Sequence, residues 1–288
     1  MRSLMLLTLI TLGPAGVAGP ATKSSLARLD AALRKEPYQG FLALLEAADR
    51  RWAEVRSYSG ILEKEERRQG KLQPKETINC RFMRDHAVRM EWLAPEQQRE
   101  KRVLYVHGQY RNKLNVQARK ILMLWRVQFD PLDPEILENT NHPITESGFG
   151  QSLRNIRQLS MTLHGQGRLE VLYGGRGQSG PAGRPCFRIT RNFKGYDRMT
   201  RSTIWLDEAT LMPVQIEAHD RMGFLERYSW PRVSLDPELP GGQDELTVRD
   251  FYRGTVFSDH RPWRKRRDSW TFEDIAPVWL GGKRTIRF

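Results

Sequence analysis

The chain has 288 residues, of which 39% are hydrophobic, and this is enough for a hydrophobic core in one large domain or two small ones. Its 47 Lys and Arg residues outnumber its 34 Asp and Glu residues, so the formal net charge is +13 at pH 7. This composition excludes a disordered chain, and the charge favours anionic partners such as lipid head groups, acidic glycans or nucleic acid. We expect no nucleic acid, because the sequence has no helix-turn-helix pattern, zinc-finger spacing or RNA-binding strand.

Residues 1–21 are typical of a secretory signal peptide. Arg2 supplies the positive charge, an apolar run extends from Leu4 to Leu12, and small residues precede a cleavage site after Ala18 or Ala21. The apolar run is shorter than the roughly 20 residues of a membrane-spanning helix. We therefore expect cleavage and a soluble mature protein in the periplasm or otherwise exported.

Three helices are predicted after the signal peptide. Residues 22–37 form a charged amphipathic segment, and residues 38–56 carry apolar side chains at helical spacing along one face: Phe41, Leu42, Leu44, Leu45, Ala48, Trp52 and Val55. A third helix is expected over 149–161, with Ser147 as its N-cap. The apolar stripe of the second helix predicts that it packs on a sheet.

The rest of the chain has the two-residue period of β-strands. Short connections with turn residues predict an antiparallel meander, because parallel strands would need longer crossovers. The expected strands are 57–66, 75–84, 86–93, 102–107, 110–116, 119–125, 168–174, 184–193, 198–207, 211–219 and 222–230.

No motif indicates an enzyme, a cofactor or a metal site. Gly175, Gly177 and Gly180 have the spacing of a dinucleotide-binding turn, but Pro181 and a strand follow them instead of a helix, so we interpret them as a hairpin loop. The six histidines are scattered. Three carboxylates, Glu63, Glu65 and Glu66, are interpreted as a solvated strand face, and we expect no catalytic residue.

Cys80 and Cys186 are the only cysteines. Strand alternation places Cys80 on the apolar face of its strand and Cys186 on the polar face of another, which predicts that they are not bridged.

A basic tail follows residue 257, with Trp263 and Trp270 flanking a cluster of cationic side chains: Arg261, Arg264, Lys265, Arg266 and Arg267. Clustered Lys and Arg beside Trp are typical of segments that bind an anionic membrane surface. A solvated tail that keeps the protein soluble is the alternative.

Several motifs resemble an exported bacterial family, the domain-of-unknown-function family 1571. They are Tyr105-Val106-His107-Gly108, Lys113-Leu114, Pro143-Ile144-Thr145-Glu146-Ser147-Gly148, and Trp205-Leu206-Asp207 leading to Pro213-Val214. The likeness covers about residues 41 to 256. The last of these motifs is also similar to periplasmic lipoprotein carriers and outer-membrane lipoprotein-sorting proteins. That resemblance implies a mainly β fold, in which a curved antiparallel sheet forms an open half-barrel capped by amphipathic helices.

The same resemblance implies a non-catalytic protein that binds a lipid, a lipoprotein acyl chain or another hydrophobic ligand on its concave face. Strand parity then names the expected lining: Ile78, Phe82, Val88, Met90, Trp92, Phe187, Ile189, Ile204, Leu206, Val214 and Ile216. These side chains could instead pack on the two helices. An interaction module that uses its basic surface on anionic glycan or membrane is the alternative function. We divide the chain into a signal peptide (1–21), a charged helix (22–37), a half-barrel domain (38–256) and a basic tail (257–288).

Overall fold

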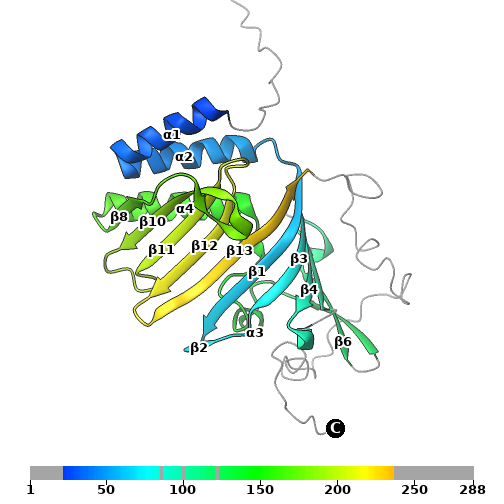
Figure 1. Cartoon of the computed structure of the whole chain (residues 1–288). Helices are drawn as coiled ribbons and strands as arrows, with labels where there is room; N and C mark the ends of the chain where they lie inside the picture. Colours follow the sequence, from blue (N-terminus) through cyan, green and yellow to red (C-terminus); the bar gives the residue numbers. More distant parts are fainter. Residues whose placement is uncertain (1–21, 85–86, 99–100, 121–122, 237–288) are drawn as a thin grey trace, which may run out of the picture.

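The structure, a computed structural model, describes residues 22–84, 87–98, 101–120 and 123–236 (Figure 1). The predicted signal peptide and basic tail lie outside these residues. The elements agree with the expected order of helices and strands. The helices are α1 (Lys23–Lys35), α2 (Pro37–Trp52), the single-turn α3 (Pro134–Leu137) and α4 (Phe149–Gly165), with 3-10 turns η1 (Glu96–Gln98), η2 (Tyr110–Asn112), η3 (Ile144–Glu146) and η4 (Pro181–Gly183).

Each of the expected strands is present, and two strands of two residues each add to them. The strands are β1 (Ser57–Arg68), β2 (Lys71–Leu72), β3 (Glu76–Met83), β4 (Ala87–Ala94), β5 (Arg102–Val106), β6 (Leu114–Lys120), β7 (Met123–Phe129), β8 (Leu169–Tyr173), β9 (Gln178–Ser179), β10 (Pro185–Phe193), β11 (Arg201–Asp207), β12 (Pro213–Asp220) and β13 (Gly223–Leu235).

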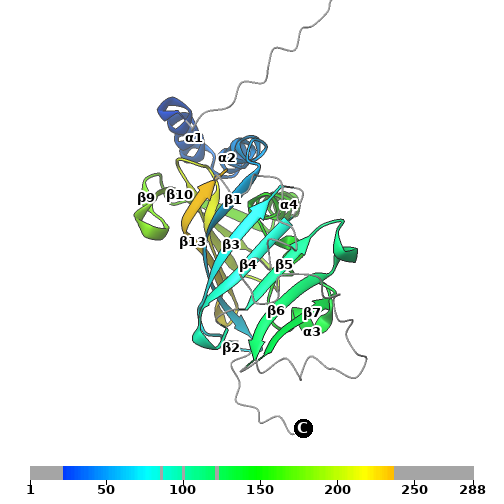
Figure 2. The ribbon, with the colours of Figure 1, turned by 90° about the vertical axis from the view of Figure 1, so that its right-hand side faces the viewer.

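The strands form one sheet in the order β7-β6-β5-β4-β3-β1-β13-β12-β11-β10-β8, and the described pairs are antiparallel. The sheet curves strongly, so that β8 to β12 face the viewer in Figure 1, whereas β3 to β5 do so in Figure 2, a view turned by 90°. It remains open, because β7 and β8 are its two ends. The predicted antiparallel half-barrel is therefore confirmed.

Several boundaries differ from the sequence-based expectation, and the strand expected at 119–125 begins at Met123. The strand expected at 110–116 begins at Leu114, because residues 110–112 form η2 with left-handed backbone angles. The second helix ends at Trp52 instead of residue 56. Ser147 does not cap α4, since its hydroxyl donates to the Ile144 carbonyl (2.6 Å) and Gly148 occupies the N-cap position.

The helices cover the concave face of the sheet. Apolar residues of α2 and α4, among them Phe41, Leu45 and Leu153, form one buried cluster with concave residues of β8, β10 and β11. Where α2, α4 and the centre of the sheet meet, five aromatic rings pack with centroids 4.5 to 6.3 Å apart. These rings belong to Trp52, Tyr58, Phe82, Phe149 and Trp230. Such contacts fix the helices on the sheet.

The glycine-rich loop connects β8 to β10, as the hairpin interpretation requires. Both cysteines are free and buried. Cys80 lies on the concave face, as predicted. Cys186 belongs to the opposite face, but it is not on a solvated surface, because the loop around Gly180 and η4 covers its sulfur.

The close approach of α4 to α2 gives a test of this packing. A Cβ at Gly150 would lie 2.1 Å from the Trp52 indole nitrogen, whereas a Cβ at Gly165 in the same helix would meet nothing within 4 Å. We expect Gly150→Ala to lower the free energy of unfolding by about 1 to 3 kcal/mol through overpacking. Gly165→Ala should leave it unchanged or raise it by up to about 1 kcal/mol. Urea unfolding measures both, and equal values for the two variants would contradict this packing.

Candidate functional site

The connection between the two edges of the sheet passes over the concave face. Because β7 and β8 are opposite ends of the sheet, the chain between them must span its width. This connection contains α4, and before it residues 130–148, which we name the crossing segment. The crossing segment holds only the single turn α3 and η3 as regular structure. Its Ile136 and Ile144 pack into the apolar cluster over β3 to β6.

The structure places the expected lining residues together on the concave face. Strand register joins Ile78 to Trp92 and Ile204 to Ile216 across neighbouring strands. The group divides between two clusters. The cluster that also contains Ile136 and Ile144 of the crossing segment includes Ile78, Phe82, Val88, Met90, Trp92 and Val214. The cluster under α2 and α4 includes Phe187, Ile189, Ile204, Leu206 and Ile216.

The sequence analysis missed part of this face. Additional concave residues in the same cluster are Tyr58, Leu62, Val103, Tyr105, Leu114, Val116 and Phe129. Four consecutive residues of β5, from Val103 to Val106, are buried, so both faces of this strand are covered and its sequence does not alternate. Alternation could have found Tyr58 and Leu62, which share the parity of the buried positions of β1.

A second feature of the concave face is a polar group where β1, β3 and β13 pair, in which the carboxylates are buried and Asn141 and His142 are exposed. We name it the junction cluster; it consists of Lys64, Glu66, Glu76, Glu226 and Tyr228 from the sheet, with Thr140, Asn141 and His142 from the crossing segment. The ammonium of Lys64 lies 3.2 Å from a Glu66 carboxylate oxygen and 3.3 Å from one of Glu76. The Tyr228 hydroxyl donates to Glu66.

The junction cluster ties the crossing segment to the sheet. His142 Nε2 lies 2.9 Å from Glu226 Oε1, and Asn141 donates to the other oxygen of Glu226 at 2.8 Å. The backbone amide of Asn141 donates to Glu66 at 3.2 Å, and the Thr140 hydroxyl donates to the same carboxylate at 3.3 Å. Buried carboxylates need such partners, because an unpaired buried charge costs several kcal/mol. Removing the crossing segment would therefore take away the hydrogen bonds of Glu226 with Asn141 and His142, whereas Glu66 would keep Lys64 and Tyr228 as partners.

Burial and charge pairing shift several pKa values in this region. Burial alone would lower the pKa of Lys64, but the charges of Glu76 and Glu66 outweigh it, so the pKa is raised. Burial would raise the pKa of Glu226, whereas the hydrogen bond and charge of His142 lower it by more. Partial desolvation would likewise lower the pKa of His142, whose side chain is 45% exposed, but hydrogen bonds to Glu146 and Glu226 raise it to about 10.

The junction cluster corrects one expectation and adds a residue that was missed. Glu66 is 2% exposed and does not belong to the solvated strand face expected for it. Side chains at even-numbered positions of β1, such as Tyr58, Leu62 and Glu66, lie on the concave side, whereas Glu63 and Glu65 lie on the convex side. The alternation of the strand could therefore have predicted the position of Glu66 from the sequence. His142 reaches the cluster only through tertiary structure, so no local pattern marks it.

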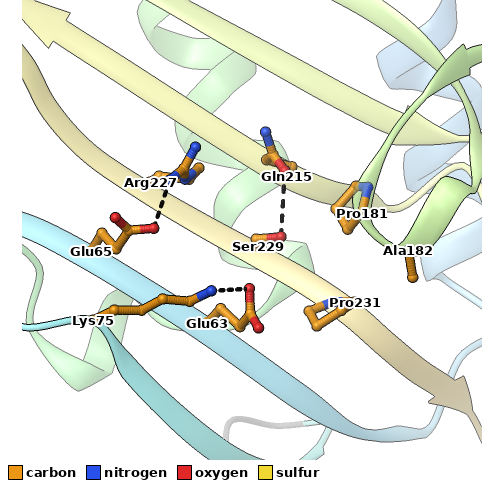
Figure 3. A pocket seen from close by; sticks show the side chains of 9 residues that line it. All are labelled: Glu63, Glu65, Lys75, Pro181, Ala182, Gln215, Arg227, Ser229 and Pro231. Carbon is orange, nitrogen blue, oxygen red and sulfur yellow. Dashed lines mark hydrogen bonds and ion pairs between the residues drawn. The ribbon is translucent and has the colours of Figure 1, made fainter. Parts of the chain in front are cut away.

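The convex side of the same strands has a polar pocket of about 240 Å³ beside η4 (Figure 3). Two ion pairs, each 2.7 Å long, join Glu63 to Lys75 and Glu65 to Arg227. The charges that line this pocket therefore satisfy one another. Within the described ranges, no group of His, Cys, Asp or Glu has the arrangement of a metal site. None of the described helices has the length and apolar character needed to cross a bilayer.

The raised pKa of His142 predicts a pH dependence. The protonated ring stabilises the fold fully below its ordinary pKa of 6.5, and this contribution is lost as the pH rises towards about 10. We expect His142→Gln to destabilise the protein most at pH 6 and progressively less up to pH 10, as measured by urea unfolding. His107→Gln, at an exposed histidine outside the junction cluster, is the control and should change the free energy of unfolding by less than about 0.5 kcal/mol. A stability difference for His142→Gln that is constant with pH would contradict the pairing.

Comparison with solved structures finds overall likeness at low identity. A crystal structure of MucB is 18% identical with a TM-score of 0.41, covering 69% of this chain and 61% of that one. The MucA/MucB complex of Pseudomonas aeruginosa is 20% identical with a TM-score of 0.39, covering 71% of this chain and 59% of that one. The lipoprotein LppX of Mycobacterium tuberculosis is 12% identical with a TM-score of 0.39, covering 69% of this chain and 97% of that one. This chain thus spans about three fifths of the two MucB structures.

A comparison with curated proteins found no match. The model of one family, described as protein of unknown function (DUF1571), matches residues 55–241, which include the strands from β1 to β13 and the crossing segment. The matched span also contains the motif from Pro143 to Gly148. In the structure Gly148 has a φ of +99°, and a Cβ there would lie 2.5 Å from the Phe82 ring, so this position requires glycine. The chain belongs to the DUF1571 family.

Proposed function

We propose that this protein is an exported, non-catalytic binding protein whose concave face accepts an apolar chain, such as the acyl chain of a lipid or of a lipoprotein. The site consists of the expected lining residues from Ile78 to Ile216 together with the crossing segment as its cover. Export is supported by the signal-peptide features of residues 1–21. The basic tail, at 257–288, lies outside the described residues and enters no step of the proposal.

One observation carries the proposal, namely the kind of cover that the apolar face has over β3 to β6. A continuous helix covers β8 to β11, whereas the crossing segment covers β3 to β6 with one helical turn and one 3-10 turn. Its apolar anchors into that cluster, Ile136 and Ile144, contribute about 1.5 to 3 kcal/mol each if fully buried. The crossing segment is therefore a weak apolar cover over a large apolar surface.

An acyl chain can compete with these anchors. Each buried methylene contributes about 0.8 kcal/mol, so ten methylenes contribute about 8 kcal/mol, more than both isoleucines together. The polar contacts of Asn141 and His142 with Glu66 and Glu226 lie at one place along the segment. These polar contacts can remain when Ile136 and Ile144 leave the apolar cluster. A bound acyl chain would then take the place of the two isoleucine side chains, while the crossing segment stays bound to the sheet through Asn141 and His142.

A pair of variants on β4 tests the site. Met90 is half-buried on the concave side, and Leu93 of the same strand is 45% exposed on the other side. We expect wild-type protein to take up a fluorescent fatty acid. Met90→Glu should weaken the affinity by about tenfold or more, because a carboxylate in an apolar site costs at least about 1.4 kcal/mol. Leu93→Glu should bind like the wild type.

Fluorescence titration measures these affinities, and circular dichroism confirms that each variant keeps its β structure. Wild-type protein that takes up no fatty acid would contradict the proposed function. Uptake by Met90→Glu equal to that of the wild type would place binding elsewhere than on the concave face.

A further inference from the structure

Arg191 is a buried cation on the concave face of β10. Strand register places it beside Val171 of the edge strand β8 and Ser202 of β11. Its side chain lies between the sheet and α4, and the residue is 3% exposed. The neighbouring concave positions one step along the strands are the apolar Ile189 and Ile204. A full charge is therefore buried at the border of the apolar face.

The hydrogen-bond partners of Arg191 are neutral. Its Nη1 donates to the Ile156 carbonyl at 3.2 Å and to the Ser160 hydroxyl at 3.0 Å, both on α4. Its Nη2 donates to the Ser202 hydroxyl at 3.2 Å. Among the residues that the structure describes, no Asp or Glu forms an ion pair with it, and its buried Nε has no partner.

Other arginines of the sheet and of α4 differ in this respect. Arg67, Arg227 and Arg157 each form an ion pair with an Asp or Glu. Burial lowers the pKa of Arg191 to about 10, so the side chain still carries its charge at neutral pH. A buried charge without a counter-charge is strongly unfavourable. Its guanidinium carbon also lies 5.2 Å from the centre of the Phe193 ring, but this contact supplies no negative charge, so packing alone does not account for an arginine here.

The unpaired edge of the guanidinium indicates which kind of group would complete its hydrogen bonds. Nε–H and the Nη2 protons form one edge of the planar group, and a carboxylate or a phosphate binds this edge through two parallel hydrogen bonds. Ser202 takes one donor of Nη2, and the described residues provide no acceptor for Nε. The Ser202 hydroxyl lies beside the same group and can donate to a further anion oxygen, whereas the Ser160 hydroxyl donates to the Ile156 carbonyl at 2.7 Å.

We propose that Arg191, with Ser202, binds an anionic group of the phosphate or carboxylate class between α4 and the sheet. The anion supplies the counter-charge that the described residues do not provide. It is either a free anion or the head group of an amphiphile, whose chain would then continue over the apolar positions of the concave face. Binding of an amphiphile head group rests on the proposed function, whereas binding of a free anion does not.

Three probes and two variants test the site. The probes are inorganic phosphate, hexadecyl phosphate and the uncharged hexadecanol, each titrated by calorimetry into the mature protein. Arg191→Met removes the cation, and Arg188→Met removes an exposed cation from the convex side of the same strand. We expect wild-type protein to bind hexadecyl phosphate about tenfold or more tightly than hexadecanol, since the two differ in a charge-assisted contact. Arg188→Met should keep this preference, and Arg191→Met should lose it.

The outcomes separate the two proposals. Equal affinity of wild-type protein for hexadecyl phosphate and hexadecanol, together with no binding of inorganic phosphate that requires Arg191, would overturn the Arg191 site and leave the proposed function standing. Binding of inorganic phosphate that requires Arg191, with neither chain bound, would support the anion site and contradict the proposed function. Binding of none of the three probes would overturn both.

Arg191→Met should fold, because it removes an uncompensated buried charge, and thermal unfolding checks this. If it does not fold, Arg191→Lys replaces it. Lysine keeps the charge but lacks the two-donor edge, so the preference for the phosphate should fall. A full preference in Arg191→Lys would contradict the two-donor contact.

Discussion

The pairing of β1 with β13 is the constraint on which the rest of the structure depends. It joins two antiparallel meanders, one of strands β1 to β7 and one of strands β8 to β13, through register pairs such as Tyr58 with Leu235 and Glu66 with Glu226. Without the β1–β13 pairing, each meander would be a separate sheet with two unpaired edge strands, and each would carry only half of the concave face. With it, β7 and β8 become the ends of one curved sheet, and the chain that connects them must cross the concave side.

This crossing decides what lies over the apolar face. Its second part, α4, is a regular helix that packs with α2 on β8 to β11, and the aromatic rings around Trp52 connect the helices to the centre of the sheet. Its first part, the crossing segment, has little regular structure and is held by a few apolar anchors and by the junction cluster. The junction cluster lies at the β1–β13 pairing itself, so the register that joins the two halves of the sheet also positions the carboxylates that bind the crossing segment.

Local pattern predicts most of this fold and little of its long-range pairing. Alternating apolar residues gave the strands, the antiparallel connections and the concave position of residues such as Ile78 and Ile204, because alternation is a property of each strand alone. Parity also marked Glu66 as concave, but a run of charged neighbours favoured a solvated interpretation. The contacts of His142 with Glu226 and of Arg191 with Ser160 join residues 84 and 31 positions apart. No local pattern carries that information.

The central claim is that the concave face holds an apolar chain, and the most direct measurement is native mass spectrometry of the mature protein purified from an envelope fraction without detergent. We predict a population whose mass exceeds that of the polypeptide by the mass of a lipid or acyl chain, released on denaturation and absent from Met90→Glu. A wild-type spectrum that contains only the polypeptide mass, from protein that then takes up no added fatty acid, would contradict the account.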